Sequence, residues 1–209
     1  KVKIPNCIKK IKSNSFCECR KLKEVEIEEE SELRIIEEGA FTKSSIEYLF
    51  IPSKLKELKE GWCKHTSKLN HISISSKNDN FKLIDEKFIV GKSSDCNDDY
   101  DILLFACRDI EKAVIPSYIK SIGQFAFSWC KNLQSIEFSK DSKIVSFEKD
   151  AFSKSSLKEI RIPSHLKEIG ERSFFKCSNF KSIEFIENSE LRLIMKKAFS
   201  FTPLKNILI

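Results

Sequence analysis

The sequence predicts a parallel β-solenoid, and two observations carry this prediction. A long segment occurs twice: IPSYIKSIGQFAFSWCKNLQSIEF begins at Ile115, and its skeleton IPS..K.IG...F..C.N..SIEF returns at Ile162. A shorter pattern, with apolar residues at positions one, four and six, recurs along the whole chain. It begins at Leu22, Ile46, Leu69, Ile110, Leu133, Leu157, Phe180 and Leu204. Such a short and regular period is typical of solenoids.

The six-residue pattern is predicted to form a short strand in every coil. Successive patterns begin 23 or 24 residues apart, with a single spacing of 41 between Leu69 and Ile110. Stacking them builds a parallel sheet whose strands lie about 4.8 Å apart, with the first, fourth and sixth side chains in a continuous core. The rest of each coil, including a short LKxI segment, is predicted to return through short strands, turns and short helical segments. Residues 1–209 would then form a single array of about eight coils.

Residues 75–109 lie inside the long spacing and are predicted to be a hairpin insertion. FKLIDEKFIV and YDILLFAC read as two strands around the polar turn GKSSDCNDD.

Phenylalanine is abundant, with seventeen in the chain, and it recurs in the turn after the LKxI segment. We expect these rings to stack from coil to coil as an aromatic spine made of Phe16, Phe41, Trp62, Phe127, Phe152, Phe174 and Phe199.

The repeat IPxxLKxIGxxAFxxCxxLxxIxI closely resembles the BspA-like leucine-rich repeats over essentially all of the chain, insertion included. Those repeats occur in surface proteins of some bacteria and parasitic flagellate protists. The resemblance implies a leucine-rich-repeat solenoid (an α/β, β-rich fold), a cell-surface or extracellular location, and adhesion to host or matrix protein. The repeat motif is specific for the fold and much less specific for function.

The eight cysteines are interpreted mostly as buried thiols that pack as small hydrophobic groups. Cys19, Cys130 and Cys177 share one repeat position but lie at least two coils apart, too far for a disulfide. The same holds for Cys17 and Cys63. Cys96 and Cys107, both near the insertion, could pair if the hairpin register allowed it.

No constellation of residues predicts catalysis, a cofactor or a metal. The three histidines, His65, His71 and His165, belong to no catalytic pattern, and the five glycines stand alone. The stretch DCNDDYD has the first spacings of a calcium loop. It has Tyr100 where the loop needs glycine and Ala106 where it needs a bidentate glutamate. We therefore expect no enzyme, no cofactor and no metal, and interpret this stretch as a solvated hairpin tip.

The third and fifth positions of the six-residue pattern should face solvent, because side chains alternate along a strand. The candidates for partner binding on this face are Tyr48, Phe50, His71, Lys112, Glu137 and Arg161. Exposed aromatic rings with a charged rim favour a contact hot spot. Alternatively, Tyr48 and Phe50 pack under the insertion, and the sequence does not decide between the two.

A basic stripe is predicted along the LKxI segments, formed by Lys9, Arg34, Lys56, Lys120, Lys167 and Arg192 with Val145 among them. It could meet a sulfated or acidic glycan. A solubilising edge that discourages strand pairing is the favoured reading.

The function predicted is a non-catalytic recognition or adhesion module that binds a protein or a surface glycan. The net charge of +6 is modest for 209 residues, so nucleic acid is not predicted, and no run is apolar enough to span a membrane. The alternative is an intracellular, cytoplasmic scaffold for protein–protein interaction, which unpaired cysteines would suit. The ends look like those of a segment from a longer chain, with core residues Ile4 and Ile207 to Ile209 uncovered.

Overall fold

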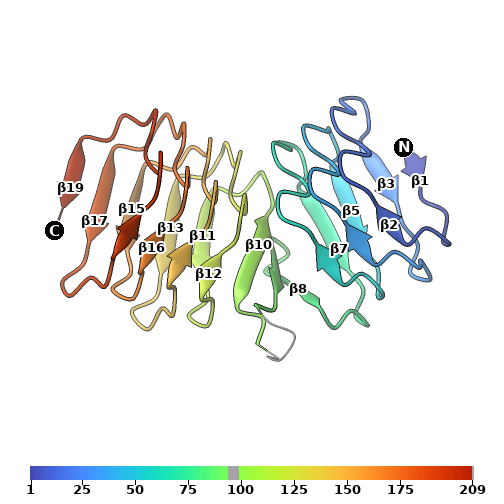
Figure 1. Ribbon diagram of the computed structural model, residues 1–209, viewed down its shortest axis with the longest axis horizontal. Helices are drawn as coiled ribbons and strands as arrows, with labels where there is room; N and C mark the ends of the chain where they lie inside the picture. The colour runs from blue at the N-terminus through green and yellow to red at the C-terminus, as the bar shows by residue number, and fades with distance from the viewer. Residues whose placement is uncertain (94–98, 209) are drawn as a thin grey trace.

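The computed structural model describes residues 1–93 and 99–208. Its coils stack in chain order along one axis, from the N-terminus to the C-terminus (Figure 1). Each coil contributes one strand to the face on which the six-residue patterns lie. These face strands are β1 (Val2–Lys3), β3 (Glu24–Glu26), β5 (Tyr48–Ile51), β7 (His71–Ile74), β11 (Lys112–Ile115), β13 (Ser135–Phe138), β15 (Glu159–Ile162), β17 (Ser182–Phe185) and β19 (Asn206–Leu208). Each of the eight predicted segments contains one face strand, and β1 precedes them.

A second row of strands comes from the LKxI segments and forms the limb of the solenoid. They are only two residues long: β2 (Lys10–Ile11), β4 (Ile35–Ile36), β6 (Glu57–Leu58), β12 (Ser121–Ile122), β14 (Ser146–Phe147), β16 (Glu168–Ile169) and β18 (Leu193–Ile194). Neighbouring limb strands pair in parallel. The predicted parallel solenoid is therefore confirmed, with short strands on the second side of each coil as well as on the face.

The pairing of the face strands follows the length of the coil. Where two patterns lie 23 residues apart, four residues pair with four: β5 with β7, β11 with β13 and β15 with β17. Where they lie 24 apart, β3 and β5 share two pairs, β17 and β19 share three, and β13 and β15 share no ladder. The extra residue thus coincides with a shorter or absent ladder, and it leaves the face sheet open between β13 and β15.

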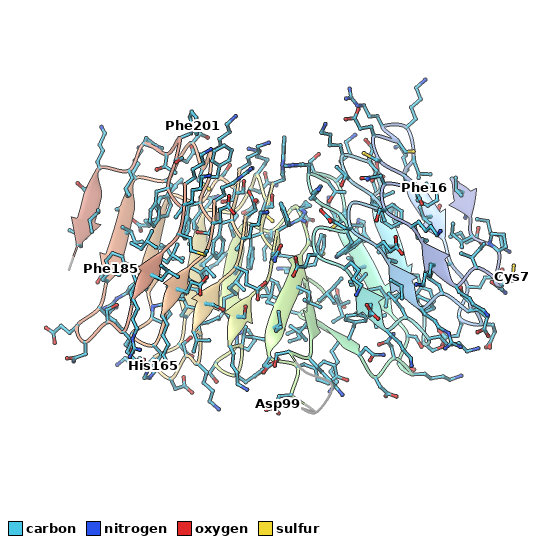
Figure 2. All side chains as sticks on the ribbon, in the orientation of Figure 1. Cys7, Phe16, Asp99, His165, Phe185 and Phe201 are labelled. Carbon is cyan, nitrogen blue, oxygen red and sulfur yellow. The ribbon has the colours of Figure 1, made fainter. Side chains whose placement is uncertain are left out.

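The third side of each coil is a turn that leads from the limb back to the face. Each turn contains two residues in the left-handed conformation, four positions apart: Asn14 and Glu18, Gly39 and Lys43, Gly61 and His65, Phe125 and Trp129, Asp150 and Lys154, Arg172 and Lys176, Lys197 and Phe201. We call the edge that these turns form the turn ridge. Figure 2 shows Phe16 and Phe201, from the first and last of these turns, along one edge of the molecule, away from His165 and Asp99.

The prediction of short helical segments is wrong, since the described residues contain no helix. The two left-handed residues in each turn, four positions apart, explain the absence of helix there, because such a residue cannot continue a right-handed helix.

The insertion is also built differently from the prediction. FKLIDEKFIV is not one strand but two, β8 (Phe81–Ile84) and β9 (Phe88–Gly91), joined by a turn with Asp85 and Glu86 at φ 51 and 55°. Positive φ at both central residues matches the twist of a tight hairpin. β9 also pairs antiparallel with β10 (Ile102–Ala106), which pairs parallel with β12. The insertion therefore supplies a limb strand to the coil that it interrupts (Figure 1).

The buried apolar residues form two cores, which meet at the insertion. In the second core the predicted aromatic spine is present: Phe127, Phe152, Phe174 and Phe199 stack with ring centroids 5.5, 4.9 and 5.2 Å apart. In the first core Phe16 stacks on Phe41 at 5.3 Å, and the spine then changes.

The assignment of Trp62 to the spine is wrong by one residue. Gly61 holds the left-handed position that Gly39 holds one coil earlier, so Cys63 occupies the position of Phe41. Trp62 instead meets Phe41 edge-on at 6.2 Å and lies tilted against Phe105 of the insertion at 5.7 Å. The same shift means that Cys17 and Cys63 do not share a repeat position.

The two halves meet around Arg108, which is only 2% exposed. Its guanidinium donates to Ala126 O at 2.8 Å and contacts the thiols of Cys130 at 3.6 Å and Cys63 at 3.7 Å. It also lies 4.3 Å from the centre of the Phe105 ring. A second link lies on the turn ridge, where Trp129 Nε1 donates to His65 Nδ1 at 2.5 Å.

The cysteines in the described residues are free. Cys63, Cys107, Cys130 and Cys177 are buried, as predicted for packing thiols, whereas Cys17 and Cys19 are half-buried and Cys7 is exposed. Burial raises the pKa of Cys63 to about 11 and that of Cys107 to about 12, so both stay protonated at neutral pH. Cys96, and with it the pairing considered for Cys107, lies outside the described residues.

The two predicted ends of the core differ. Ile4 is buried, at 7% exposure, contrary to the prediction, whereas Ile207 is 60% exposed. Ile209 lies outside the described residues.

Candidate binding surfaces

The N-terminal part of the face sheet carries an aromatic platform. Tyr48 and His71 are register partners on β5 and β7, and their rings stack 4.7 Å apart at an interplanar angle of 12°. Tyr48 is 48% exposed, so the hairpin insertion does not cover it. Phe50 is half-buried and packs against the first core.

A shallow depression of about 230 Å³ lies on this part of the face. Tyr48, Phe50 and His71 line it together with two carboxylates, Glu24 and Glu26. The carboxylates bind Lys1 at 3.0 and 3.2 Å. The depression thus joins exposed ring surface to a charged rim.

The other three predicted face residues lie on two further sheets: Lys112 and Glu137 on β11 and β13, and Arg161 on the sheet of β15, β17 and β19. Lys112 was expected one coil beyond His71, but the insertion intervenes and β7 does not pair with β11. Lys112 binds Glu137 at 2.7 Å, and Arg161 binds Glu184 at 3.2 Å. These charges are partnered within the face, in contrast to the aromatic platform.

The opening between β13 and β15 holds a second groove of the face, with a volume of about 550 Å³. Glu137 and Arg161 line it, and apolar walls come from Ile136, Phe138 and Ile162. Our sequence reasoning did not find this groove. The 24-residue spacing between Leu133 and Leu157 is a signal that could have pointed to it, although two other 24-residue coils keep their ladders.

The basic stripe has the predicted stacking, in two runs. Backbone bonds join Lys9 to Arg34 and Arg34 to Lys56, and a second series runs from Lys120 through Val145 to Lys167 and Arg192. Between the runs, the equivalent place belongs to Asp101, whose carbonyl accepts from the Lys120 amide at 2.7 Å. A carboxylate therefore interrupts the row of cations.

Asp101, the last residue of the stretch interpreted as a solvated hairpin tip, is itself buried. Its side chain is 1% exposed and binds Lys120 Nζ at 3.0 Å, the Ser93 amide at 2.9 Å and the Ser93 hydroxyl at 3.0 Å. Burial raises the pKa of Asp101, but these hydrogen bonds outweigh it and hold the pKa below its usual value. Of the other residues with calcium-loop spacing, Asp99 is exposed, whereas Asp95 and Asn97 lie outside the described residues.

Several cations of the stripe have carboxylate partners. Arg34 lies 3.7 Å from Glu32, and Lys167 lies 3.8 Å from Glu190. In the described ranges no group of three or more histidine, cysteine or acidic side chains is arranged to hold a metal ion. Nor do the described residues contain a helix that is long and apolar enough to cross a membrane.

A parallel solenoid with one short face strand in each coil is the architecture of a leucine-rich repeat array. The BspA type leucine rich repeat region matches residues 1–89 and 103–209 in six copies, so the chain belongs to this family. No curated protein is significantly similar to the chain in sequence.

Solved structures share the fold at low sequence identity. The pneumococcal vaccine antigen PcpA is 22% identical with a TM-score of 0.87, and the match covers 98% of this chain and 49% of PcpA. A leucine rich cell surface protein from Faecalibacterium prausnitzii A2-165 is 19% identical with a TM-score of 0.66, covering 96% of this chain and 62% of that one. A leucine-rich repeat protein from Eubacterium ventriosum is 17% identical with a TM-score of 0.71, covering 100% and 66%. The chain thus spans about half to two thirds of the length of these proteins.

Proposed function

We propose that this chain is a non-catalytic recognition module that binds a protein partner through the N-terminal part of its face sheet. One observation carries the proposal: the Tyr48 ring is exposed, yet it is held parallel to His71 at 4.7 Å. A ring that is already ordered loses little conformational entropy on binding, and exposed aromatic residues supply much of the energy of protein interfaces.

The comparisons support a role at the cell surface. PcpA is named a vaccine antigen, and the Faecalibacterium prausnitzii protein is named a cell surface protein. By analogy, we assign this chain to adhesion or recognition at a cell surface, with a host or matrix protein as the partner. Glu137 and Arg161, at the second groove, extend the same face and would contact the same partner.

The test is binding of the chain to an array of purified matrix proteins, with a matched pair of tyrosine variants. Tyr48→Ser removes the platform, whereas Tyr118→Ser removes a tyrosine of similar exposure, 44%, that lies outside the face strands. We expect Tyr48→Ser to weaken binding roughly tenfold or more and Tyr118→Ser to leave it unchanged. Equal effects of the two variants, or no binding by the wild type to any member of the array, would contradict the proposal.

The free thiols favour a second candidate, an intracellular scaffold for protein–protein interaction. The seven cysteines in the described residues are unpaired, which suits a reducing compartment. Localisation of the full-length protein in its own cells separates the two: surface labelling of intact cells supports the adhesion module, and labelling only after permeabilisation supports the scaffold.

A further inference from the structure

The turn ridge of the C-terminal half gathers cations and aromatic rings from consecutive coils. Backbone hydrogen bonds fix the register of neighbouring coils. The Trp129 amide donates to Ser153 O at 3.0 Å, the Lys154 amide to Phe175 O at 2.8 Å, and the Lys176 amide to Ser200 O at 3.0 Å. Because each coil advances by about one strand spacing, the side chains follow one another in steps of roughly 5 Å. We call the following set the ridge cluster: Trp129, Lys131, Lys154, Arg172, Phe175 and Lys176.

The rings of the ridge cluster hold its cations in place. Lys154 Nζ and Lys131 Nζ lie 4.7 and 5.2 Å from the centre of the Trp129 ring. The Arg172 guanidinium and Lys176 Nζ lie 4.4 and 5.4 Å from the centre of the Phe175 ring. Cation–π contacts order the positive groups without neutralising them.

Little negative charge opposes these cations. Among the described residues, Lys131, Lys154 and Lys176 form no ion pair, in contrast to Arg34, Lys120 and Lys167 of the basic stripe. Arg172 Nε lies 3.2 Å from Asp150 Oδ1, without the alignment of a hydrogen bond. Asp150 is almost fully buried, and Glu171 lies close to it.

The pKa values of two titratable groups are lowered, beyond the effect of burial, by the resulting positive potential. Burial lowers the pKa of Lys154, and Lys176, Arg172 and Lys131 lower it further. Burial also lowers the pKa of His65 to about 4, with Lys154 as the next contributor. Binding of an anion lowers the electrostatic free energy of a surface on which like positive charges lie close together.

We propose that the ridge cluster is a binding site for a linear sulfated polysaccharide. Regularly spaced, preordered cations along a ridge complement a chain whose anionic groups recur along its length. Sulfate groups stay ionised at every physiological pH, so they match Lys131, Lys154 and Lys176, which form no ion pair among the described residues.

A single-stranded nucleic acid fits less well, although basic and aromatic residues together also occur in its binding sites. Its bases need free ring faces for stacking, whereas both Trp129 and Phe175 already have cations over their rings. The ridge cluster is also separate from the aromatic platform of the face sheet, so the two proposals can fail independently.

The experiment measures binding of the whole chain to heparin, as the sulfated probe, at several salt concentrations, with desulfated heparin and a thymidine oligonucleotide beside it. The ridge variant is Lys131→Gln/Lys154→Gln/Lys176→Gln. The control variant Lys9→Gln/Lys56→Gln/Lys167→Gln removes the same charge from the basic stripe. We expect the ridge variant to bind heparin roughly tenfold or more weakly, with the slope of log Kd against log salt reduced by about one for each lysine removed.

The control variant and Tyr48→Ser should bind heparin as the wild type does, and desulfated heparin should not bind. Equal losses in the ridge and control variants would overturn the proposal, because they would show attraction by net charge alone. Tighter binding of the oligonucleotide than of heparin through the same lysines would overturn it in favour of nucleic acid. Circular dichroism and the Tm check the fold of each variant, and the single exposed change Lys131→Glu provides the same test if the triple variant unfolds.

Discussion

The two halves of the molecule use one repeat but pack it differently. In the second core every coil has phenylalanine at the same turn position, and the rings stack almost parallel from Phe127 to Phe199. In the first core, Cys63 holds this turn position in the coil before the insertion. Trp62 lies edge-on to Phe41 and tilted against Phe105, and the Arg108 guanidinium lies over the Phe105 ring. The repeat therefore sets the path of the backbone, whereas a single turn residue decides whether neighbouring coils share a continuous aromatic spine.

The largest effect is expected at the centre of the second spine. Phe152 is fully buried and contacts Phe127, Phe147 and Phe174. Phe152→Ala should cost about 3–5 kcal/mol of unfolding free energy, because it removes transfer energy and leaves a cavity. Phe16→Ala, which removes a half-buried ring with one stacking partner, should cost roughly half as much. Urea unfolding followed by circular dichroism measures both, and equal losses would show that the two spines do not differ.

The next effect concerns the junction between the cores. Arg108→Ala removes the guanidinium that contacts both the Cys63 and the Cys130 thiols and should cost about 2–4 kcal/mol. We expect the unfolding of the two halves to separate. Trp62 reports on the first core and Trp129 on the turn ridge of the second half, so the single-tryptophan variants Trp129→Phe and Trp62→Phe follow each half by fluorescence.

Arg108→Met serves as the control for this junction. It keeps much of the side-chain volume and removes the buried charge, so its cost should be smaller than that of Arg108→Ala. Coincident transitions of the two tryptophans in Arg108→Ala would show that the halves are coupled by other contacts.

A third, smaller effect tests the link on the turn ridge through pH. His65 has its pKa lowered to about 4, so it stays neutral in the folded protein and accepts the Trp129 hydrogen bond. In the unfolded chain the His65 imidazole binds a proton below about pH 6.5. Between pH 6.5 and 4 the unfolded state therefore holds more protons, and stability falls as the pH falls, by at most about 3 kcal/mol in total. Thermal unfolding from pH 7 to 4 should show this loss in the wild type and a shallower one in His65→Gln.

The smallest effect concerns the residue that interrupts the basic stripe. Asp101→Asn weakens the contacts to Lys120 and Ser93 and should cost about 1 kcal/mol at pH 7. Because the pKa of Asp101 is lowered by folding, its contribution is present at neutral pH and is lost as the pH falls through the folded-state pKa. Glu190→Gln, at the exposed pair with Lys167, is the matched change and should leave the unfolding midpoint unchanged.

Much of the fold and part of the surface could be predicted. The six-residue pattern located every face strand after β1, and side-chain alternation correctly exposed Tyr48. The spine residue at the third turn was misassigned, because the aromatic residue of that coil, Trp62, stands one residue before the spine position, which Cys63 holds. The insertion was read as two strands, because its tight turn uses Asp85 and Glu86 and lacks the glycine that usually marks a hairpin.

The ridge cluster was missed for a different reason. Its residues come from the left-handed positions and their neighbours, where the repeat places unrelated side chains such as Trp129, Lys154 and Lys176. Only contacts between coils bring the rings and the cations together, and no spacing within one repeat reveals them.

By itself the sequence determined the repeat, the face strands and the composition of the core, because apolar residues at a constant period can be buried only by stacking identical coils. The tertiary structure decided how the coils join: the opening between β13 and β15, the place of Asp101 in the stripe, and the burial of Arg108 between two cores. These features depend on distances between residues that are far apart in the chain. A one-residue change in a turn or an inserted strand alters such distances and leaves the repeat pattern intact.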